Sequence, residues 1–298
     1  MRVRVLGSAA GGGFPQWNCG CSNCRGVRTG TIPARARTQE SVAVTADDEH
    51  WILLNASPDV RQQIDAFPAL HPRAVRQTPI AAIVLTNGDL DHCLGLLSLR
   101  ESEPLAVYAT DRVRHGFVDH NAVARALERF PGHVGWTRLV PGTEVSLPGG
   151  LVLEPIAAPG RPPLHLLGRV EPSDEDNIGL VIRDPRGGSL AYFPGVARVT
   201  PPIADALRGT DCCFFDGTFW SSDELIALGI GARRAEQMGH LPVGGSDGSL
   251  AALPGIPGPR FYIHVNNTNP LLREDSAAHA AVRAAGWEVA YDGLGVEL

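Results

Sequence analysis

The chain has 298 residues, 44% of them hydrophobic and 19% charged, which is the composition of a globular protein and excludes a disordered one. Its formal net charge of -6 argues against non-specific binding to nucleic acid or to an anionic membrane. No apolar run approaches the roughly 20 residues that span a bilayer, and Met1–Gly7 lacks the apolar stretch of a signal peptide. We therefore expect a cytoplasmic protein without nucleic-acid partners or membrane insertion, and the sequence leaves a homodimer open.

Short apolar segments bounded by turn residues predict strands, and helical spacing of apolar positions predicts helices. Strands in runs with helices interspersed favour two packed sheets with helices outside them, in one α/β domain over residues 1–298. The expected strands are Met1–Gly7, Ser41–Thr45, Trp51–Asn55, Ile80–Thr86, Leu151–Ile156, Gly179–Arg183, Ser189–Phe193, Cys212–Phe215 and Phe261–Val265. The expected helices are Leu94–Glu101, Ala122–Phe130 and Ala277–Ala285, and residues 244–259 are expected to form loops.

Three of the six cysteines crowd together with the spacing C-x-C-x-x-C, at Cys19, Cys21 and Cys24. In a reducing compartment such thiolates are typical of metal ligands rather than of disulfides. Soft sulfur ligands select zinc or an iron–sulfur cluster, and we favour a structural zinc because the other cysteines lie in apolar strand or helix contexts. A fourth ligand must then come from elsewhere in the chain. Three free thiols on a loop are the alternative.

A polar segment with Asp89, Asp91 and His92 follows the predicted strand Ile80–Thr86 directly. Ligands at the carboxyl end of a buried strand lie where open active sites form. Two carboxylates and an imidazole form a hard-to-borderline donor set that suits iron, manganese or zinc. The structural alternative is an Asp-His pair that only caps a helix.

Later polar residues occupy similar places. His264 lies in an apolar strand, His240 follows a predicted helix, and Asp216 follows the apolar segment Cys212–Phe215. Burial of a histidine at a strand end is unusual without a partner, although a backbone carbonyl could satisfy each. Other histidines are expected at the surface, namely His50, His71, His115, His120, His133 and His279.

The Asp-His segment resembles the metal loop T-H-x-H-x-D-H of the metallo-β-lactamase superfamily. Residues 86–92 read TNGDLDH, so Asn87 and Asp89 stand in place of the two upstream histidines. Residues 193–196 (FPGV) match the place of the superfamily's metal-bridging aspartate and carry no carboxylate. The resemblance implies a four-layer αββα sandwich of two mixed β-sheets flanked by helices, while the departures weaken the expectation of a binuclear zinc hydrolase.

Longer segments resemble the pyrroloquinoline quinone (PQQ) biosynthesis protein B family within this superfamily. They are residues 6–19, 55–59, 215–218, 238–240 and 264–270, and the resemblance extends over essentially the whole chain. It implies a role in making PQQ from a peptide carrying a cross-linked Glu-Tyr pair. PQQ or its precursor is therefore the expected ligand, with other PQQ-biosynthesis proteins as further partners. The family is described both as a PQQ carrier or export helper and as an iron-dependent hydroxylase.

The resemblance also bears on the cysteine site. A related phosphonate-pathway phosphodiesterase has the same C-x-C-x-x-C zinc site, and its fourth ligand is a histidine three residues after an active-site histidine. The matching residue here is Asn267, three after His264. Asparagine is a poor zinc ligand, so the Asn267 amide oxygen and a water molecule both remain open as the fourth ligand.

We favour an oxidative enzyme with Fe²⁺ at the catalytic site. Asp91, His92 and a later histidine would form the two-histidine, one-carboxylate set of a non-haem iron(II) protein. His264 and His240 remain alternatives for the third ligand. Such a site would hydroxylate a tyrosine-derived ring.

Two further carboxylates are expected to support this site. Asp89 would ligate directly or orient His92, and Asp216 would hold His240 or His264 in its working tautomer. The rival functions are a zinc hydrolase and a carrier that binds PQQ without turnover. Because PQQ has three carboxylates, a carrier or an enzyme would need basic residues at its pocket. The candidate substrate-binding residues are Arg61, Arg233 and Arg234, with Asp59, although Asp59 and Arg61 could equally form a surface ion pair.

Overall fold

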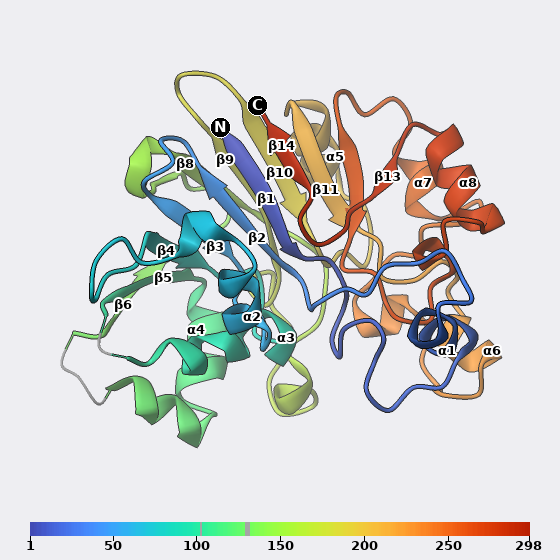
Figure 1. The fold of residues 1–298 in the computed structure, drawn as a ribbon, viewed down its shortest axis with the longest axis horizontal. Helices are drawn as coiled ribbons and strands as arrows, with labels where there is room; N and C mark the ends of the chain where they lie inside the picture. Colours follow the sequence, from blue (N-terminus) through green and yellow to red (C-terminus); the bar gives the residue numbers. More distant parts are fainter. Residues whose placement is uncertain (102, 129–131) are drawn as a thin grey trace.

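Two β-sheets face each other in the computed structural model, which describes residues 1–101, 103–128 and 132–298 (Figure 1). Within these residues each sheet has seven strands. The first sheet contains, in order, β14 (Gly295–Glu297), β1 (Arg2–Gly7), β2 (Ser41–Thr45), β3 (Trp51–Leu54), β4 (Ile80–Val84), β5 (Leu105–Ala109) and β6 (Val134–Arg138). The second contains β13 (Glu288–Val289), β12 (Arg260–Ile263), β11 (Cys212–Asp216), β10 (Ser189–Phe193), β9 (Ile178–Arg183), β8 (Val152–Ala157) and β7 (Val145–Ser146).

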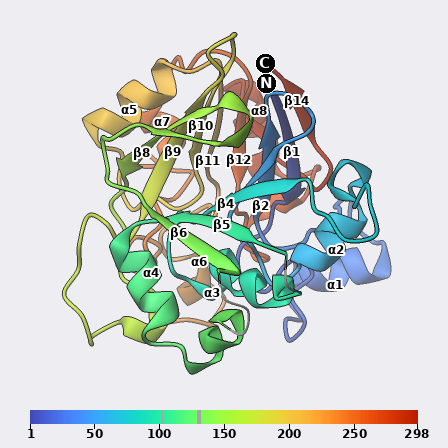
Figure 2. The same cartoon turned by 90° about the vertical axis from the view of Figure 1, so that its left-hand side faces the viewer.

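Helices cover the outer faces of the two sheets (Figure 2). The α-helices are α1 (Ser22–Thr29), α2 (Val60–Asp65), α3 (Leu90–Cys93), α4 (Asp111–Val118), α5 (Pro201–Arg208), α6 (Glu224–Ala227), α7 (Ser249–Ala252) and α8 (Ala277–Ala284). Short 3-10 helices are η1 (Pro68–Leu70), η2 (Leu94–Leu99), η3 (Ala122–Glu128), η4 (Pro148–Gly150), η5 (Leu164–Leu166), η6 (Glu236–Met238) and η7 (Pro270–Leu272). None of the described helices has the length and apolar character needed to cross a membrane.

Alternation along the strands divides the buried side chains into three layers. On β2, Val42 and Val44 face the second sheet and join Leu180 and Phe214 in the central layer, whereas Ala43 faces outward. The outer layer of the first sheet packs against α2, η2, α4 and η3, and that of the second sheet packs against α5, α7 and α8. This is the four-layer αββα sandwich of the metallo-β-lactamase fold, and the fold prediction is confirmed.

The predicted strands are all present, with ends shifted by one or two residues. The helix predicted at Ala277–Ala285 is α8. Those predicted at Leu94–Glu101 and Ala122–Phe130 are the 3-10 helices η2 and η3, and the end of the second lies outside the described residues. Residues 244–259 contain the short helix α7 among the predicted loops. Among the elements that the prediction missed are the strands β5, β6, β7, β13 and β14 and the helices α1, α2, α4, α5 and α6.

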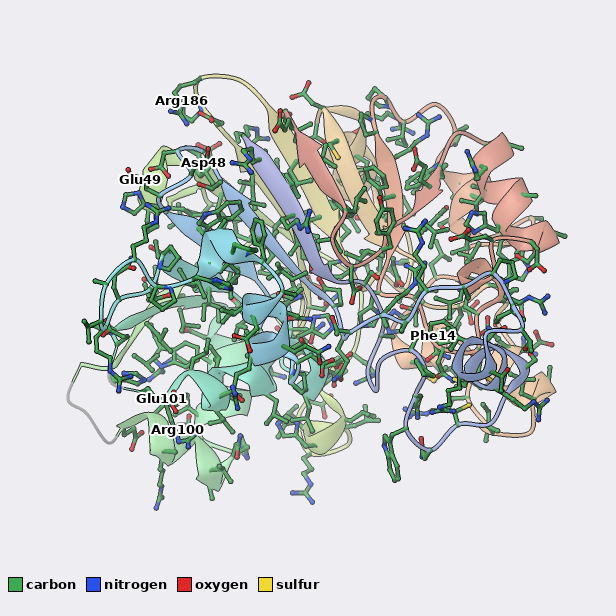
Figure 3. All side chains as sticks on the ribbon, in the orientation of Figure 1. Phe14, Asp48, Glu49, Arg100, Glu101 and Arg186 are labelled. Carbon is green, nitrogen blue, oxygen red and sulfur yellow. The ribbon has the colours of Figure 1, made fainter. Side chains whose placement is uncertain are left out.

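Four strands end at the same edge of the sandwich and carry the polar residues of interest there. β3 and β4 are parallel neighbours in one sheet, as are β11 and β12 in the other. Asn55, Thr86, Asp216 and His264 lie at or just beyond their carboxyl ends. Both chain termini lie at the opposite end of the sheets, near Asp48, Glu49 and Arg186, whereas Phe14 lies beside α1 (Figure 3).

Candidate metal centres

Three ligand atoms from distant parts of the chain converge at this edge. His92 Nε2 and His264 Nε2 lie 3.2 Å apart, and Asp91 Oδ2 lies 3.2 Å from His264 Nε2 and 3.8 Å from His92 Nε2. Asp91 and His92 belong to α3, which begins after β4, and His264 directly follows β12. Both imidazoles are buried, while the Asp91 carboxylate is partly accessible. The structure thus brings His264, rather than His240, to Asp91 and His92.

Two of the three spacings in this group, the Asp91–His92–His264 triad, fit one metal ion, whereas Asp91 Oδ2 and His92 Nε2 lie wider apart, at 3.8 Å. Donors about 2.1 Å from an ion, at angles between octahedral and tetrahedral values, lie about 3.0–3.4 Å from each other. Burial lowers the pKa of His92 to about 4, against the opposing charge of Asp91, so this imidazole is neutral at pH 7. Burial alone would raise the pKa of Asp91, but the neighbouring imidazoles outweigh it and hold that pKa below its ordinary value. A neutral imidazole and a carboxylate are the forms that bind a cation.

Thr218 fixes the ring of His264. The Thr218 hydroxyl donates to Asp216 Oδ1 at 2.6 Å, so it can only accept from His264 Nδ1, which lies 2.7 Å away. That bond places the His264 proton on Nδ1 and leaves the Nε2 lone pair directed at the triad. His264 holds this place with φ = 59°, a left-handed conformation that costs a non-glycine residue about 1–3 kcal/mol.

Asp216 and His240 form a second pair beside the triad. His240 Nδ1 lies 2.8 Å from Asp216 Oδ2, and the ring of His240 stacks on that of His264 at 5.2 Å. Asp216 is fully buried and also accepts from Val196 N and from both the amide and the hydroxyl of Thr218. Burial alone would raise its pKa, but the His240 imidazole holds it below the ordinary value. Burial alone would lower the pKa of His240, but Asp216 raises it instead.

A buried polar network contacts His92 at Nδ1, the ring nitrogen that faces away from the triad. Asn55 Oδ1 accepts from the amide and hydroxyl of Thr86, and its Nδ2 lies 2.9 Å from Glu40 Oε2 and 2.7 Å from His92 Nδ1. Glu40 also accepts from the Tyr192 hydroxyl, and burial raises its pKa well above the ordinary value. Asn55 has φ = 64°, so left-handed residues follow both β3 and β12.

Asp89 does not join the triad, contrary to the expectation that it would ligate the metal or orient His92. Its carboxylate pairs with Arg161, at 3.1 Å from Nη2 and 3.3 Å from Nη1, and accepts from Leu164 N at 3.0 Å. Arg161 Nε in turn donates to Met238 O. The pair therefore ties the metal loop to the segment around η5 and to the segment before His240.

A cavity of about 820 Å³ opens above the triad. It lies within the range typical of small-molecule sites. His240, Arg161 and Arg233 line it together with the triad, and so do Gly11, Gly12, Gln39, Asn87, His165 and Asn266. Gly11 lies close to the triad, where a Cβ would be 3.1 Å from Asp91 Oδ2, tighter than ordinary contacts.

The cysteine cluster, defined as Cys19, Cys21 and Cys24, lies on the loop before α1 and on its first turn. The three sulfur atoms lie within 4.8 Å of one another. Sulfurs bound to one zinc at about 2.3 Å are roughly 3.8 Å apart, so the cluster fits such an ion. Asn267 lies beside it, with Nδ2 3.3 Å from Cys24 Sγ and 3.9 Å from Cys21 Sγ. Rotation of this amide by half a turn would direct its oxygen at the sulfurs instead.

Comparison with known proteins agrees with this geometry. The model of the Beta-lactamase superfamily domain matches residues 50–264. Coenzyme PQQ synthesis protein B of Azotobacter vinelandii is 45% identical over 302 residues, which cover the whole of both chains. The chain belongs to the coenzyme PQQ synthesis protein B family. The member from Methylococcus capsulatus is also 45% identical, again over the whole of both chains.

Solved structures support the family and the fold. The Zn²⁺-bound PqqB from Methylobacterium extorquens is 43% identical and superimposes with a TM-score of 0.93, covering both chains completely. A diphosphatase of the PhnP family has a TM-score of 0.69 at 22% identity, covering 98% of its own chain, and shares the fold. One member of the family, the relative from M. extorquens, thus holds zinc on this scaffold.

Of the candidate substrate-binding residues, the structure places only one at the cavity. Arg233 lines the cavity, whereas Arg61 and Arg234 are exposed and do not. Asp59 does not line the cavity, but its carboxylate accepts from the main-chain and side-chain amides of Gln39, which does. Arg161 and its contacts could not be foreseen, because the residue lies in an irregular segment.

Two further histidines lie in places that the sequence analysis did not predict. His165 lines the cavity and was not considered, although it lies in an apolar segment like His264. His133 was expected at the surface but is 3% exposed.

Proposed function

We propose that the protein is an iron(II)- and oxygen-dependent hydroxylase of PQQ synthesis that acts on the tyrosine-derived ring of a cross-linked Glu-Tyr precursor. The observation that carries the proposal is the triad, one carboxylate and two imidazoles on one side of a large cavity. This donor set suits iron(II) and leaves positions open for other ligands. Bound iron(II) would supply the redox chemistry that activates oxygen. One oxygen atom would enter the ring, and the other would leave as water with two electrons from an added reductant.

The protein's own residues would bind and orient the ring. His240 carries its Nδ1 proton toward Asp216, so its Nε2 is free to accept a proton from a ring hydroxyl in the cavity. Arg233 supplies positive charge for substrate carboxylates, whereas most donors of Arg161 are engaged by Asp89, Met238 and Pro162. The role in PQQ synthesis follows from the name of the relatives of 43–45% identity.

A zinc hydrolase is the second candidate, because the solved relative from M. extorquens holds zinc. Against it, Asn87 and Asp89 replace the imidazoles that the usual binuclear site needs, and Asp89 is committed to Arg161. A carrier that binds PQQ in the same cavity is the third.

One assay separates these functions. Protein purified without oxygen is supplied with iron(II) or zinc, with the precursor and with a two-electron reductant such as ascorbate, and both oxygen uptake and product are then measured in air. The hydroxylase requires iron(II), consumes oxygen in proportion to product, and is inhibited by zinc, which has no accessible redox change. Turnover by zinc protein without oxygen would establish the hydrolase, and tight PQQ binding without turnover the carrier.

A further inference from the structure

The two candidate metal centres share one short segment of chain. His264 belongs to the triad, and Asn267, three residues later, contacts the sulfurs of Cys21 and Cys24. The segment is held at its start, since Val265 N donates to Ser8 O and Val265 O accepts from Ala10 N. Only two residues therefore separate the parts of this segment that lie at the two centres.

Asn269 connects this segment to the support of His264. Its side chain is fully buried, and Nδ2 donates to Gly217 O at 2.8 Å and to Thr218 O at 3.2 Å. Asn266 N also donates to Thr218 O. Thr218 is the residue whose hydroxyl accepts from His264 Nδ1, so Asn269 fixes the backbone that carries this acceptor.

Asn23 connects the same segment to the cysteine cluster. It lies on α1 between two cluster cysteines and is 4% exposed. Its Nδ2 donates to Asn269 O at 3.0 Å and to Asn267 O at 3.2 Å. Both side-chain amide groups, of Asn23 and of Asn269, thus donate their two hydrogens to main-chain carbonyls near the two centres.

We propose that Asn23 and Asn269 are positioning residues that couple the cysteine cluster to the Asp91–His92–His264 triad, so that a metal held by the cluster tightens metal binding at the triad. The inference rests on the metal-binding part of the proposed function, not on hydroxylation. Ordering of α1 by the cluster fixes Asn23, Asn23 fixes the carbonyls of residues 267 and 269, and Asn269 fixes Thr218. Coupling of this kind is reciprocal, so metal at the triad also tightens the cluster.

The test measures cobalt(II) binding at the triad in protein whose cluster holds zinc. Asn269→Asp keeps the acceptor for Leu271 N but replaces both donors by a carboxylate oxygen. Asn23→Ala removes its two donors without adding charge. Asn177→Ala is the comparison variant, because its Nδ2 also donates to two main-chain carbonyls, those of residues 158 and 195, and its Oδ1 accepts from Asn87, all outside the segment between the two centres.

We expect cobalt affinity at the triad to fall about 10-fold in Asn269→Asp and Asn23→Ala, a loss typical of residues that orient metal ligands. The cobalt absorption bands should change shape, because His264 is displaced. If Asn269→Asp does not fold, Asn23→Ala alone decides. Unchanged affinity and spectrum in Asn23→Ala, or an equal loss in Asn177→Ala, would overturn the proposal.

A second measurement addresses the coupling itself. The zinc affinity of the cluster is compared with the triad filled by cobalt and with the triad disabled by His92→Ala. The filled triad should tighten zinc binding in the natural sequence and in Asn177→Ala, but not in Asn269→Asp. Equal zinc affinity in both states of the natural protein contradicts the coupling. If the protein proved not to be a hydroxylase, these binding results would still stand. If the natural protein did not bind cobalt at the triad, both the coupling and the proposed function would be wrong.

Discussion

His92 and His264 present their Nε2 atoms to each other at 3.2 Å, although 172 positions separate them in the chain. Both rings are buried, and Thr218 holds the proton of His264 on Nδ1. We interpret the two ring nitrogens and the Asp91 carboxylate that face one point as a candidate site for a cation.

Removal of one ligand should therefore abolish metal binding at the triad without loss of the fold. We expect His92→Ala and Asp91→Ala to lose iron(II) while they retain zinc at the cysteine cluster. Metal analysis of anaerobically purified protein measures both. Asp89→Asn is the matched control, since Asp89 pairs with Arg161 instead; equal iron loss in this variant would show that the triad is not the iron site.

A substitution at Gly11 tests metal binding at the triad without changing any of its three ligands. A Cβ there would lie 3.1 Å from Asp91 Oδ2, which is tighter than ordinary contacts and must displace the carboxylate. We expect Gly11→Ala to weaken metal binding at the triad by about 10-fold while the melting temperature changes little. Gly135→Ala, where a Cβ has only a distant neighbour at 4.0 Å, should leave binding unchanged. Full metal affinity in Gly11→Ala would mean that the present position of the Asp91 carboxylate is not required for metal binding.

The fold was predictable because most strands are apolar segments with clear turn boundaries, and the ligands Asp91 and His92 because they directly follow β4. The prediction failed where tertiary contacts decide. The strand β6 has largely exposed residues and only two apolar ones, Val134 and Trp136. Asp89 has the sequence position of a ligand, but its carboxylate pairs with Arg161. Long-range hydrogen bonds, such as that from Asn269 to Thr218, have no signature in local sequence.

The choice between His264 and His240 could not be made from the sequence for the same reason. Both follow apolar or helical segments, and their roles depend on the left-handed turn at His264 and on the position of Asp216. A positive φ at a non-glycine residue is set by the packed strands on either side. It is a property of the assembled sheets rather than of neighbouring residues.

The cysteine cluster should stabilise the fold through zinc. Cys24→Ala should lose bound zinc and at least about 3 kcal/mol more unfolding free energy than Cys212→Ala, because metal binding adds directly to folding. Both cysteines are fully buried, so the two variants remove the same atoms from a buried site. Chemical denaturation with zinc quantification gives the comparison, and equal stability of the two variants would contradict a structural zinc.

The pair of Asp216 and His240 predicts a pH dependence. Asp216 outweighs burial and raises the pKa of His240, so in Asp216→Asn burial should dominate and the pKa should fall below its ordinary value of 6.5. Because the folded pKa is raised, the pair stabilises the fold below the unfolded pKa, and this contribution is lost as pH rises through the folded value. Imidazole NMR titration of metal-free protein measures the shift. Asp119→Asn at the surface should leave His240 unchanged, and a pKa unaffected by Asp216→Asn would refute the pairing.

Arg233 and Arg234 provide a matched pair for substrate recognition. They are adjacent and both exposed, but only Arg233 lines the cavity above the triad. A ligand with several carboxylates, such as PQQ, should therefore bind about 10-fold more weakly to Arg233→Ala, a loss of about 1.4 kcal/mol, and normally to Arg234→Ala. Because the contact is between charges near solvent, the difference should shrink as salt concentration rises. Equilibrium titration of PQQ at two salt concentrations measures both effects. An equal loss in the two variants would indicate general attraction by surface charge, and no loss in either would place the carboxylates elsewhere in the cavity, with Arg161 as the next residue to change.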